Sequence, residues 1–352
     1  ENKNLNPNEN PNENYKMDND IFDNYILSHK LNYYDNFHNE ELNINDKILK
    51  GIFSYGFERP SPIQRLAIKP LMDGNDIVIQ SHSGTGKTAT FLIGLLSRIN
   101  ENENVPQSII ISNTRELASQ TFKVFESIGY YTNIKCKLCI GGDMQYKYTS
   151  SEINEQLIIG TPGRLCDLIS KKTINAETIK IIVIDEADDV LSTGFSKQIK
   201  KIFNYIPKEA QVALVSATIP QEMSSLFDIL LKPDYISILI KDDQLTLDGI
   251  MQFYINLDEQ YKIDAIIDLY QFINIGQGII YCNRKNKADE LQEVLISRDF
   301  SVGVLHGDMM QKERELIMTN FRNGNTRILI TTDILSRGID IQQVSIVINF
   351  DM

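Results

Sequence analysis

The sequence lacks the features of secreted and membrane-spanning proteins. Only four cysteines occur among 352 residues, which fits a reducing compartment. No apolar run approaches the ~18 residues of a membrane-spanning helix, and the N-terminus does not have the pattern of a signal peptide. We therefore expect a cytoplasmic protein, with the nucleus as the alternative. Cys136 and Cys139 have the spacing of a metal or redox pair, but no second pair follows, and we interpret them as ordinary strand cysteines.

Positive charge is also scarce. The chain has 35 Lys and Arg against 47 Asp and Glu, a formal net charge of −12. This argues against a protein that grips nucleic acid by bulk positive charge, although a local track of basic side chains and backbone donors can still hold a few phosphates. The apolar content of 42% is enough for packed cores, and a chain of this length usually forms two domains.

A glycine-rich loop, SHSGTGKT at Ser81–Thr88, follows an apolar strand and precedes an apolar run of helical length. This order is the context of a phosphate-binding loop. Glycines let backbone N–H groups converge on phosphate oxygens, and the helix N-terminus favours negative charge. We expect Lys87 to reach the β- and γ-phosphates and the Thr88 hydroxyl to bind Mg²⁺. The nucleotide-binding residues expected in this loop are Ser83, Gly84, Thr85, Gly86, Lys87 and Thr88.

Two carboxylates follow a second buried strand, Ile181–Ile184. Asp185 comes at the carboxyl end of this strand, where α/β sheets bind ligands. We expect Asp185 to hold Mg²⁺, directly or through water, and Glu186 to orient the attacking water. A solvated acidic helix start is the alternative. The strand before these residues favours the catalytic interpretation, with Lys87, Asp185 and Glu186 as catalytic residues.

These motifs and several others, in the same order, resemble those of the DEAD-box ATP-dependent RNA helicases, and within that family the translation initiation factor 4A group. The resemblance implies an ATP hydrolase with ATP and Mg²⁺ as cofactors and RNA as a sequence-independent partner. It also implies a monomer, with scaffold proteins of the translation initiation complex as further partners and no membrane. The stretches that carry it are Gly56–Gln64, Thr114–Ala118, Gly141–Gly142, Thr161–Arg164, Asp185–Asp188, Ser216–Thr218, His306–Asp308, Thr331–Asp333 and Arg337–Asp340.

The resemblance assigns roles to further residues around ATP. Gln64 matches a position that reads adenine, since a carboxamide can donate to and accept from its edge, and Phe57 offers a face for stacking. A helix-capping Gln and a core Phe are the alternatives. Gly338 and Asp340 match positions that reach the ribose. The first position of the loop, usually Gly or Ala, is Ser81 here.

Other positions match the family's RNA contacts and its coupling motif. Hydroxyls, guanidinium groups and backbone N–H groups bind phosphates and 2′-hydroxyls without reading the base. Ser216 and Thr218 match the motif that couples hydrolysis to strand separation, with a hydroxyl pair capping the next helix as the alternative. The RNA-contact positions are Arg115, Gly142, Thr161, Gly163, Arg164, Gly307, Thr332 and Arg337.

Alternating strands and helices predict an α/β fold with parallel sheets covered on both faces, and the resemblance implies two tandem RecA-like domains. We expect a disordered Asn-rich extension at 1–40, a first domain at 41–240, a linker at 241–249 and a second domain at 250–352. Asn113 and Glu116 are expected to cap a helix. The expected strands are Ile77–Gln80, Ser108–Ser112, Ile134–Ile140, Leu157–Gly160, Ile181–Ile184, Val212–Ser216, Gln252–Asn256, Gly278–Cys282, Val302–Leu305, Arg327–Thr332 and Ile346–Phe350.

One element of the family pattern is missing. The family has an arginine-bearing element, which acts on the γ-phosphate, after the strand that is here Ile346–Phe350, and this chain stops at Met352. We therefore expect the second domain to be truncated at its C-terminus and catalysis to be impaired. An RNA-binding clamp or scaffold without productive turnover is the alternative function. A relative acting in splicing-linked complexes or ribosome biogenesis also stays open.

Overall fold

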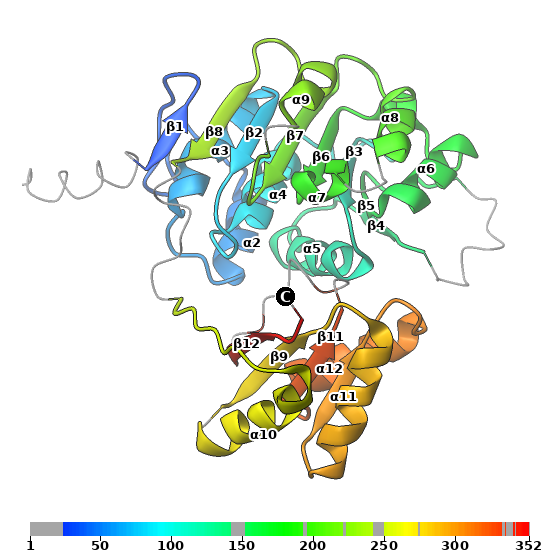
Figure 1. Ribbon diagram of the computed structural model, residues 1–352. Coiled ribbons are helices and arrows are strands. Elements are labelled where there is room, and N and C mark those ends of the chain that lie inside the picture. The colour runs from blue at the N-terminus through cyan, green and yellow to red at the C-terminus, as the bar shows by residue number, and fades with distance from the viewer. Residues whose placement is uncertain are drawn as a thin grey trace, which may run out of the picture. The chain divides into compact units, whose positions relative to one another are not determined.

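The computed structural model describes residues 24–141, 152–192, 196–220, 223–241, 250–273, 275–332, 335, 341 and 343–351. Contacts divide the chain into two units, Glu1–Asp248 and Gly249–Met352, coloured from blue to green and from yellow to red in Figure 1. The expected linker at 241–249 falls at this division, and its residues 242–249 lie outside the described part. Among the described helices, none is long and apolar enough to cross a membrane.

The first unit is built on an eight-stranded sheet in the order β1-β8-β2-β7-β6-β3-β5-β4. All neighbours are parallel except β1 and β8. The inner strands β2, β3, β5, β6 and β7 are buried at every position, as expected for a parallel sheet covered on both faces. The strands are β1 (Tyr25–Leu27), β2 (Ile77–Gln80), β3 (Ser108–Ser112), β4 (Cys136–Cys139), β5 (Leu157–Gly160), β6 (Ile181–Asp185), β7 (Gln211–Ser216) and β8 (Ile236–Ile240).

Helices cover both faces of this sheet (Figure 1). Alternate residues of one strand enter opposite cores: Ile77 and Ile79 pack with α2 to α5, whereas Val78 packs with α6 to α9. This is the two-residue period of a strand. The helices are α2 (Asp46–Ser54), α3 (Pro62–Asp73), α4 (Lys87–Leu96), α5 (Arg115–Ile128), α6 (Pro162–Ser170), α7 (Ala187–Ser192), α8 (Ser196–Phe203) and α9 (Ser224–Leu230).

The expected disordered extension at 1–40 is wrong for residues 24–40, which pack on the first unit. Tyr25–Leu27 form β1 and pair with β8, Tyr25 opposite Ile240. Tyr34 and Phe37 are buried in the hydrophobic core of α2 to α5. Burial of these aromatic side chains stabilises the packed segment. Residues 1–23 lie outside the described part.

The expected cap of α5 is also wrong by one residue. The Thr114 hydroxyl accepts a hydrogen bond from the Leu117 N–H at 3.2 Å, and Thr114 has the extended backbone of an N-cap. The Asn113 side chain instead donates to the Asp189 carboxylate.

Cys136 and Cys139 lie on β4 as free thiols, and burial raises the pKa of both. This supports their interpretation as strand cysteines.

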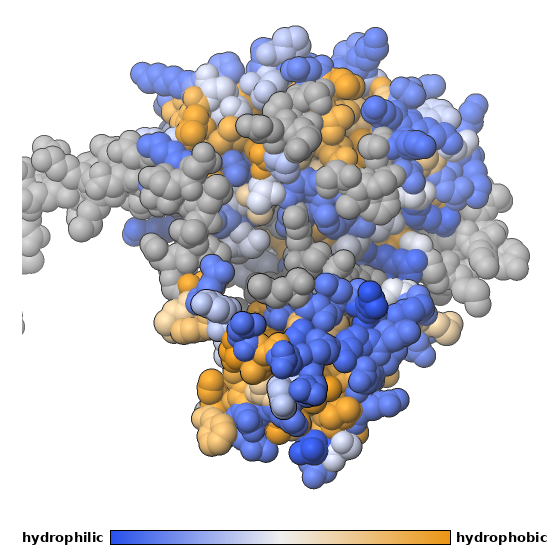
Figure 2. Space-filling view, viewed as in Figure 1, coloured by the Kyte–Doolittle hydropathy of each residue, from blue (hydrophilic) through white to orange (hydrophobic). Residues whose placement is uncertain are grey.

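The second unit has a parallel four-stranded sheet in the order β10-β11-β9-β12. Figure 2 shows apolar residues at the surface of this unit.

The expected strand Gln252–Asn256 is wrong: residues 250–258 are irregular, and Phe253 and Tyr254 are exposed. A strand needs a neighbour for its N–H and C=O groups, and no described strand pairs with this segment. The elements are α10 (Lys262–Phe272), β9 (Gln277–Tyr281), α11 (Lys285–Ser297), β10 (Val302–Leu305), α12 (Gln311–Arg322), β11 (Ile328–Thr331) and β12 (Val344–Asn349).

Candidate functional site

The glycine-rich loop connects the end of β2 to the start of α4, as the sequence predicts. Gly84 and Gly86 have φ angles of +79° and +92°, a left-handed conformation that side chains with a Cβ disfavour. At Gly86 an added Cβ would also lie 2.7 Å from Gln64 Nε2, whereas at Gly84 it would meet nothing within 4 Å. The loop therefore needs glycine at Gly84 for its backbone, and at Gly86 for its backbone and for space.

Lys87 is buried at the start of α4, and its ammonium group lies among polar groups. Its Nζ donates to the carbonyl oxygens of Ser81 at 2.7 Å and His82 at 2.8 Å. Burial lowers the pKa of Lys87, and the nearby carboxylates of Glu186, Asp185 and Asp188 oppose this shift. The fold thus brings the lysine of one motif close to the carboxylates of the other, although β7 separates their two strands in the sheet.

Asp185 ends β6, and Glu186 follows it in a left-handed conformation with φ of +50°. Such a backbone is unfavourable for a residue with a side chain and is frequent at functional sites. Burial, with the charge of Glu186 second, raises the pKa of Asp185 to about 7. Asp185 Oδ1 accepts from the Glu186 N–H at 3.0 Å, but no donor among the described residues reaches Asp185 Oδ2. A buried carboxylate oxygen of this kind suits a hydrated Mg²⁺ ion.

A hydroxyl network at the end of β7 connects these two parts. Ser216 Oγ accepts from the backbone N–H groups of Asp188 and Thr218, both at 3.4 Å. The Thr218 hydroxyl donates to the Asp188 carboxylate, and the Ser216 carbonyl accepts from the Ser81 N–H at 3.2 Å. Ser216 and Thr218 therefore lie between the loop and the carboxylates. Asp188 joins this network and was not predicted as a site residue, although it belongs to the same motif as Asp185.

Gln64 lies in the first turn of α3 and contacts the loop. Its Oε1 accepts from the Ser61 N–H at 2.8 Å, which is the capping interaction that the sequence left open. Its Nε2 points at the Gly86 carbonyl at 3.5 Å, and the Ser61 hydroxyl donates to the Thr85 carbonyl at 2.8 Å. Phe57 is half-buried against the core and against the Tyr55 ring. The start of α3 thus holds the loop from one side.

The expected RNA contacts of the first unit follow neighbouring parallel strands. Arg115 begins α5 after β3, and Thr161 precedes α6 after β5. Gly163 is exposed in the first turn of α6, where Arg164 forms an ion pair with Asp167 at 3.3 Å. Because parallel strands end at the same edge, these groups gather at the edge that also carries the loop.

In the second unit, Gly307 follows β10 and Thr332 follows β11, which are neighbours in the sheet. The Gly307 carbonyl accepts from Arg314 Nη2 at 2.6 Å. These two positions share one edge of the second sheet. The remaining predicted site residues, Gly142, Arg337, Gly338 and Asp340, lie outside the described part of the chain.

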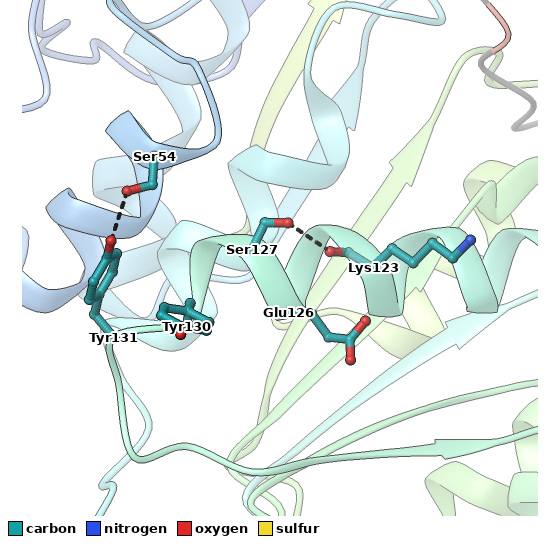
Figure 3. A pocket seen from close by; sticks show the side chains of 6 residues that line it. All are labelled: Ser54, Lys123, Glu126, Ser127, Tyr130 and Tyr131. Atoms are coloured by element: carbon teal, nitrogen blue, oxygen red, sulfur yellow. Dashed lines mark hydrogen bonds between the residues drawn. The ribbon is translucent and has the colours of Figure 1, made fainter.

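An open pocket of about 540 Å³ lies elsewhere on the first unit, between α2 and the C-terminal end of α5 (Figure 3). The Ser54 and Tyr131 hydroxyls are 3.2 Å apart on one side of it, and Lys123, Glu126 and Tyr130 complete much of its lining. It contains none of the predicted site residues. The pocket is therefore separate from the predicted ATP site.

Two family profiles match this chain. The DEAD/DEAH box helicase profile matches residues 61–226, and the helicase conserved C-terminal domain matches residues 261–352. A Pyricularia oryzae protein named ATP-dependent RNA helicase eIF4A is 46% identical over 315 residues, or 89% of this chain and 79% of the relative. A protein of the same name from Aspergillus niger is 45% identical over the same shares.

Solved structures agree with these matches. Dbp5 of S. cerevisiae, bound to RNA and ADP BeF3, superposes with a TM-score of 0.84 and 35% identity, covering 91% of this chain and 81% of that one. A DEAD box protein from Methanococcus jannaschii gives a TM-score of 0.54 and 36% identity, covering 91% and 86%. The predicted fold of tandem RecA-like domains with parallel sheets is confirmed.

Proposed function

Because the chain belongs to the DEAD-box family of ATP-hydrolysing RNA helicases, we propose that it couples ATP hydrolysis to local unwinding of RNA duplexes. The proposed process is translation initiation in the cytoplasm, because the similar proteins from Pyricularia oryzae and Aspergillus niger carry the name eIF4A. The protein acts as a monomer with scaffold proteins of the initiation complex as partners. Its helicase domains are those expected at 41–240 and 250–352, with residues 24–40 added to the first.

The observation that carries this proposal is the buried cluster of one ammonium group and several carboxylates at one edge of the first sheet. Lys87 binds the β- and γ-phosphates of ATP, which replace its carbonyl partners. Thr88 and Asp185 would hold Mg²⁺, which would neutralise phosphate charge. Glu186 orients the attacking water and accepts its proton. The unsatisfied oxygen of Asp185 and the backbone of Glu186 support these two roles.

The base and the RNA are bound by groups around this cluster. Gln64 reads the adenine edge, and Phe57 stacks on the base. The Gln64 amide also contacts the Gly86 carbonyl, which ties base recognition to the loop. RNA is held without regard to sequence by hydroxyls, guanidinium groups and backbone N–H groups. The proposed positions are Arg115, Gly142, Thr161, Gly163, Arg164, Gly307, Thr332 and Arg337, with Gly338 and Asp340 on the ribose of ATP.

Coupling is proposed to pass through the hydroxyl network of Ser216 and Thr218. This network touches Asp188 on the catalytic side and the Ser81 N–H on the phosphate side. A change at the phosphates therefore alters hydrogen bonds at the end of β7. Loss of one partly buried hydrogen bond in such a network costs about 1 kcal/mol, so Thr218→Ala is expected to uncouple unwinding while ATP still binds.

The test measures ATP hydrolysis and separation of a short RNA duplex by the same preparation. The proposal predicts hydrolysis that rises on adding RNA, and unwinding that needs ATP. Thr218→Ala should retain hydrolysis and lose unwinding, whereas Thr178→Ala, a hydroxyl loss on the same unit away from this cluster, should retain both. Binding of RNA without stimulated hydrolysis in the unaltered protein would contradict the proposal and favour an RNA clamp.

A further inference from the structure

Strands β3 and β6 are parallel neighbours in the first sheet, and they end at the same level. Ser112, the last residue of β3, is opposite Asp185, the last residue of β6. The segment that leads into α5 therefore leaves the sheet beside the segment that leads into α7. The first of these segments begins with Asn113, and the second begins with Glu186.

A side-chain hydrogen bond joins the two segments. Asn113 Nδ2 donates to the carboxylate of Asp189, which lies in the first turn of α7. The direction follows from the groups, because an amide nitrogen donates and a carboxylate oxygen accepts. Asn113 Oδ1 is buried, and no donor among the described residues reaches it. The contact with Asp189 is therefore what orients this amide.

The start of α7 in turn holds the backbone of Glu186. The Glu186 carbonyl accepts from the N–H groups of Asp189 at 3.0 Å and Val190 at 3.1 Å. Glu186 has a left-handed φ of +50°, and a backbone in this conformation persists only where its surroundings fix it. Asp189 therefore helps to fix the residue that is proposed to orient the attacking water.

On its other side, Asn113 adjoins the start of α5. Thr114 is the N-cap of this helix, and Arg115 is its first residue. Because Arg115 is one of the proposed RNA contacts, RNA bound there meets a backbone that is two residues from Asn113. The contact between Asn113 and Asp189 thus connects the proposed RNA site with the backbone of Glu186.

We propose that Asn113 is a positioning residue that transmits RNA binding at the start of α5 to the carboxylates at the end of β6. The inference rests on the proposed function. RNA that fixes the start of α5 also fixes the Asn113 amide, which holds Asp189 and with it the Glu186 carbonyl. This connection is separate from the hydroxyl network at the end of β7, which reaches α7 through Asp188.

The pair allows the bond to be broken and then restored. A hydrogen bond to a carboxylate is worth about tenfold or more in an equilibrium constant. Asn113→Ala should therefore lower RNA stimulation, the ratio of the hydrolysis rates with and without RNA, about tenfold. Asn113→Asp should lower it further, because it places two carboxylates in contact. Adding Asp189→Asn to Asn113→Asp puts the amide on α7 and should bring the stimulation back to within about threefold of normal.

The test is single-turnover hydrolysis of ATP by the full chain, with and without saturating single-stranded RNA. Labelled ADP is titrated on the same preparations, and its Kd should be unchanged, because β6 and β7 separate β3 from the strand of the phosphate loop. Urea titration gives the folded fraction, so that rates are compared per folded molecule. Asn100→Ala, which removes an amide contact with the Glu103 carboxylate on the exposed surface, should match the unaltered protein.

Four outcomes would overturn the inference. Normal RNA stimulation in Asn113→Ala would show that this amide transmits nothing, and equal falls of the rates with and without RNA would show that it acts independently of RNA. An exchanged pair as slow as Asn113→Asp would show that the added charge acts on the RNA and not on Asp189. A loss that disappears per folded molecule would leave a structural role alone. If RNA does not stimulate the unaltered protein, the proposed function itself is wrong.

Discussion

Exchange of the two left-handed glycines of the phosphate loop tests the geometry of the proposed ATP site in detail. Gly84→Ala and Gly86→Ala add the same methyl group two residues apart, at φ angles of +79° and +92°. A left-handed conformation costs a residue with a Cβ about 1–2 kcal/mol. Both variants should therefore bind ADP about 5- to 30-fold more weakly from the backbone term alone.

Only Gly86→Ala carries a second effect. Its Cβ would lie 2.7 Å from Gln64 Nε2, whereas the one at Gly84 meets nothing within 4 Å. Gln64 is buried and held by its contact with Ser61, so its amide must leave its place. A well-placed amide contact to a base is worth about 1–3 kcal/mol of discrimination. Gly86→Ala should therefore lose most of the preference for ADP over GDP.

The assay is competition of unlabelled ADP and GDP against fluorescent ADP for each variant. We expect the ratio of the two dissociation constants to stay at its normal value in Gly84→Ala and to fall about fivefold or more in Gly86→Ala. The proposed link between base recognition and the loop would be refuted if the ratio fell equally in both variants. It would also be refuted if the ratio were unchanged in Gly86→Ala.

Three further predictions concern single groups. Gln64→Ala should weaken ATP binding by about 1–3 kcal/mol and leave the weaker binding of GTP unaltered. Equal losses of ATP and GTP affinity in a competition titration would show that Gln64 only caps α3. Thr114→Ala should lower the free energy of unfolding by about 1 kcal/mol in urea titration, whereas Thr114→Ser keeps the cap; equal stability of both would show that this hydroxyl does not cap α5. Because the pKa of Asp185 is raised to about 7, the folded protein holds a proton on this carboxyl group in the pH range where the unfolded chain has already lost it. Stability should therefore fall as pH rises from about 4 to about 7, and Asp185→Asn should flatten this slope in urea titrations at pH 5 and pH 8; a slope unchanged in Asp185→Asn would assign it to other groups.

The phosphate loop and the Asp185 strand are predictable because their signals are local. A buried strand, a glycine-rich turn and a helix follow one another at Ile77–Leu96, and parallel pairing then brings the end of β2 to the same edge as the end of β6. Each of these steps depends on short-range pattern and on the general behaviour of parallel sheets. The approach of Lys87 to Asp185 follows from them.

Long-range pairing is what the sequence does not display. Strand β1 has three residues, and it pairs with a strand more than 200 positions later in the chain; its apolar pattern is too short to predict this partner. The alternating segment Gln252–Asn256 reads as a strand, yet no described strand pairs with it. Gln64 shows a third limit of prediction from sequence. One side-chain amide makes both the local cap and the contact with the loop, so the local pattern does not separate the two roles.

Glu186 is the residue proposed to activate the water that attacks ATP. Glu186→Gln keeps the size of the side chain and removes its ability to accept a proton. The direct measurement is single-turnover hydrolysis of ATP in the presence of RNA, with binding of both ligands measured on the same preparation. Glu186→Gln should bind ATP and RNA normally and hydrolyse at least about 100-fold more slowly, whereas Glu209→Gln on the exposed surface should match the unaltered protein. RNA-stimulated hydrolysis at a normal rate in Glu186→Gln would contradict the account.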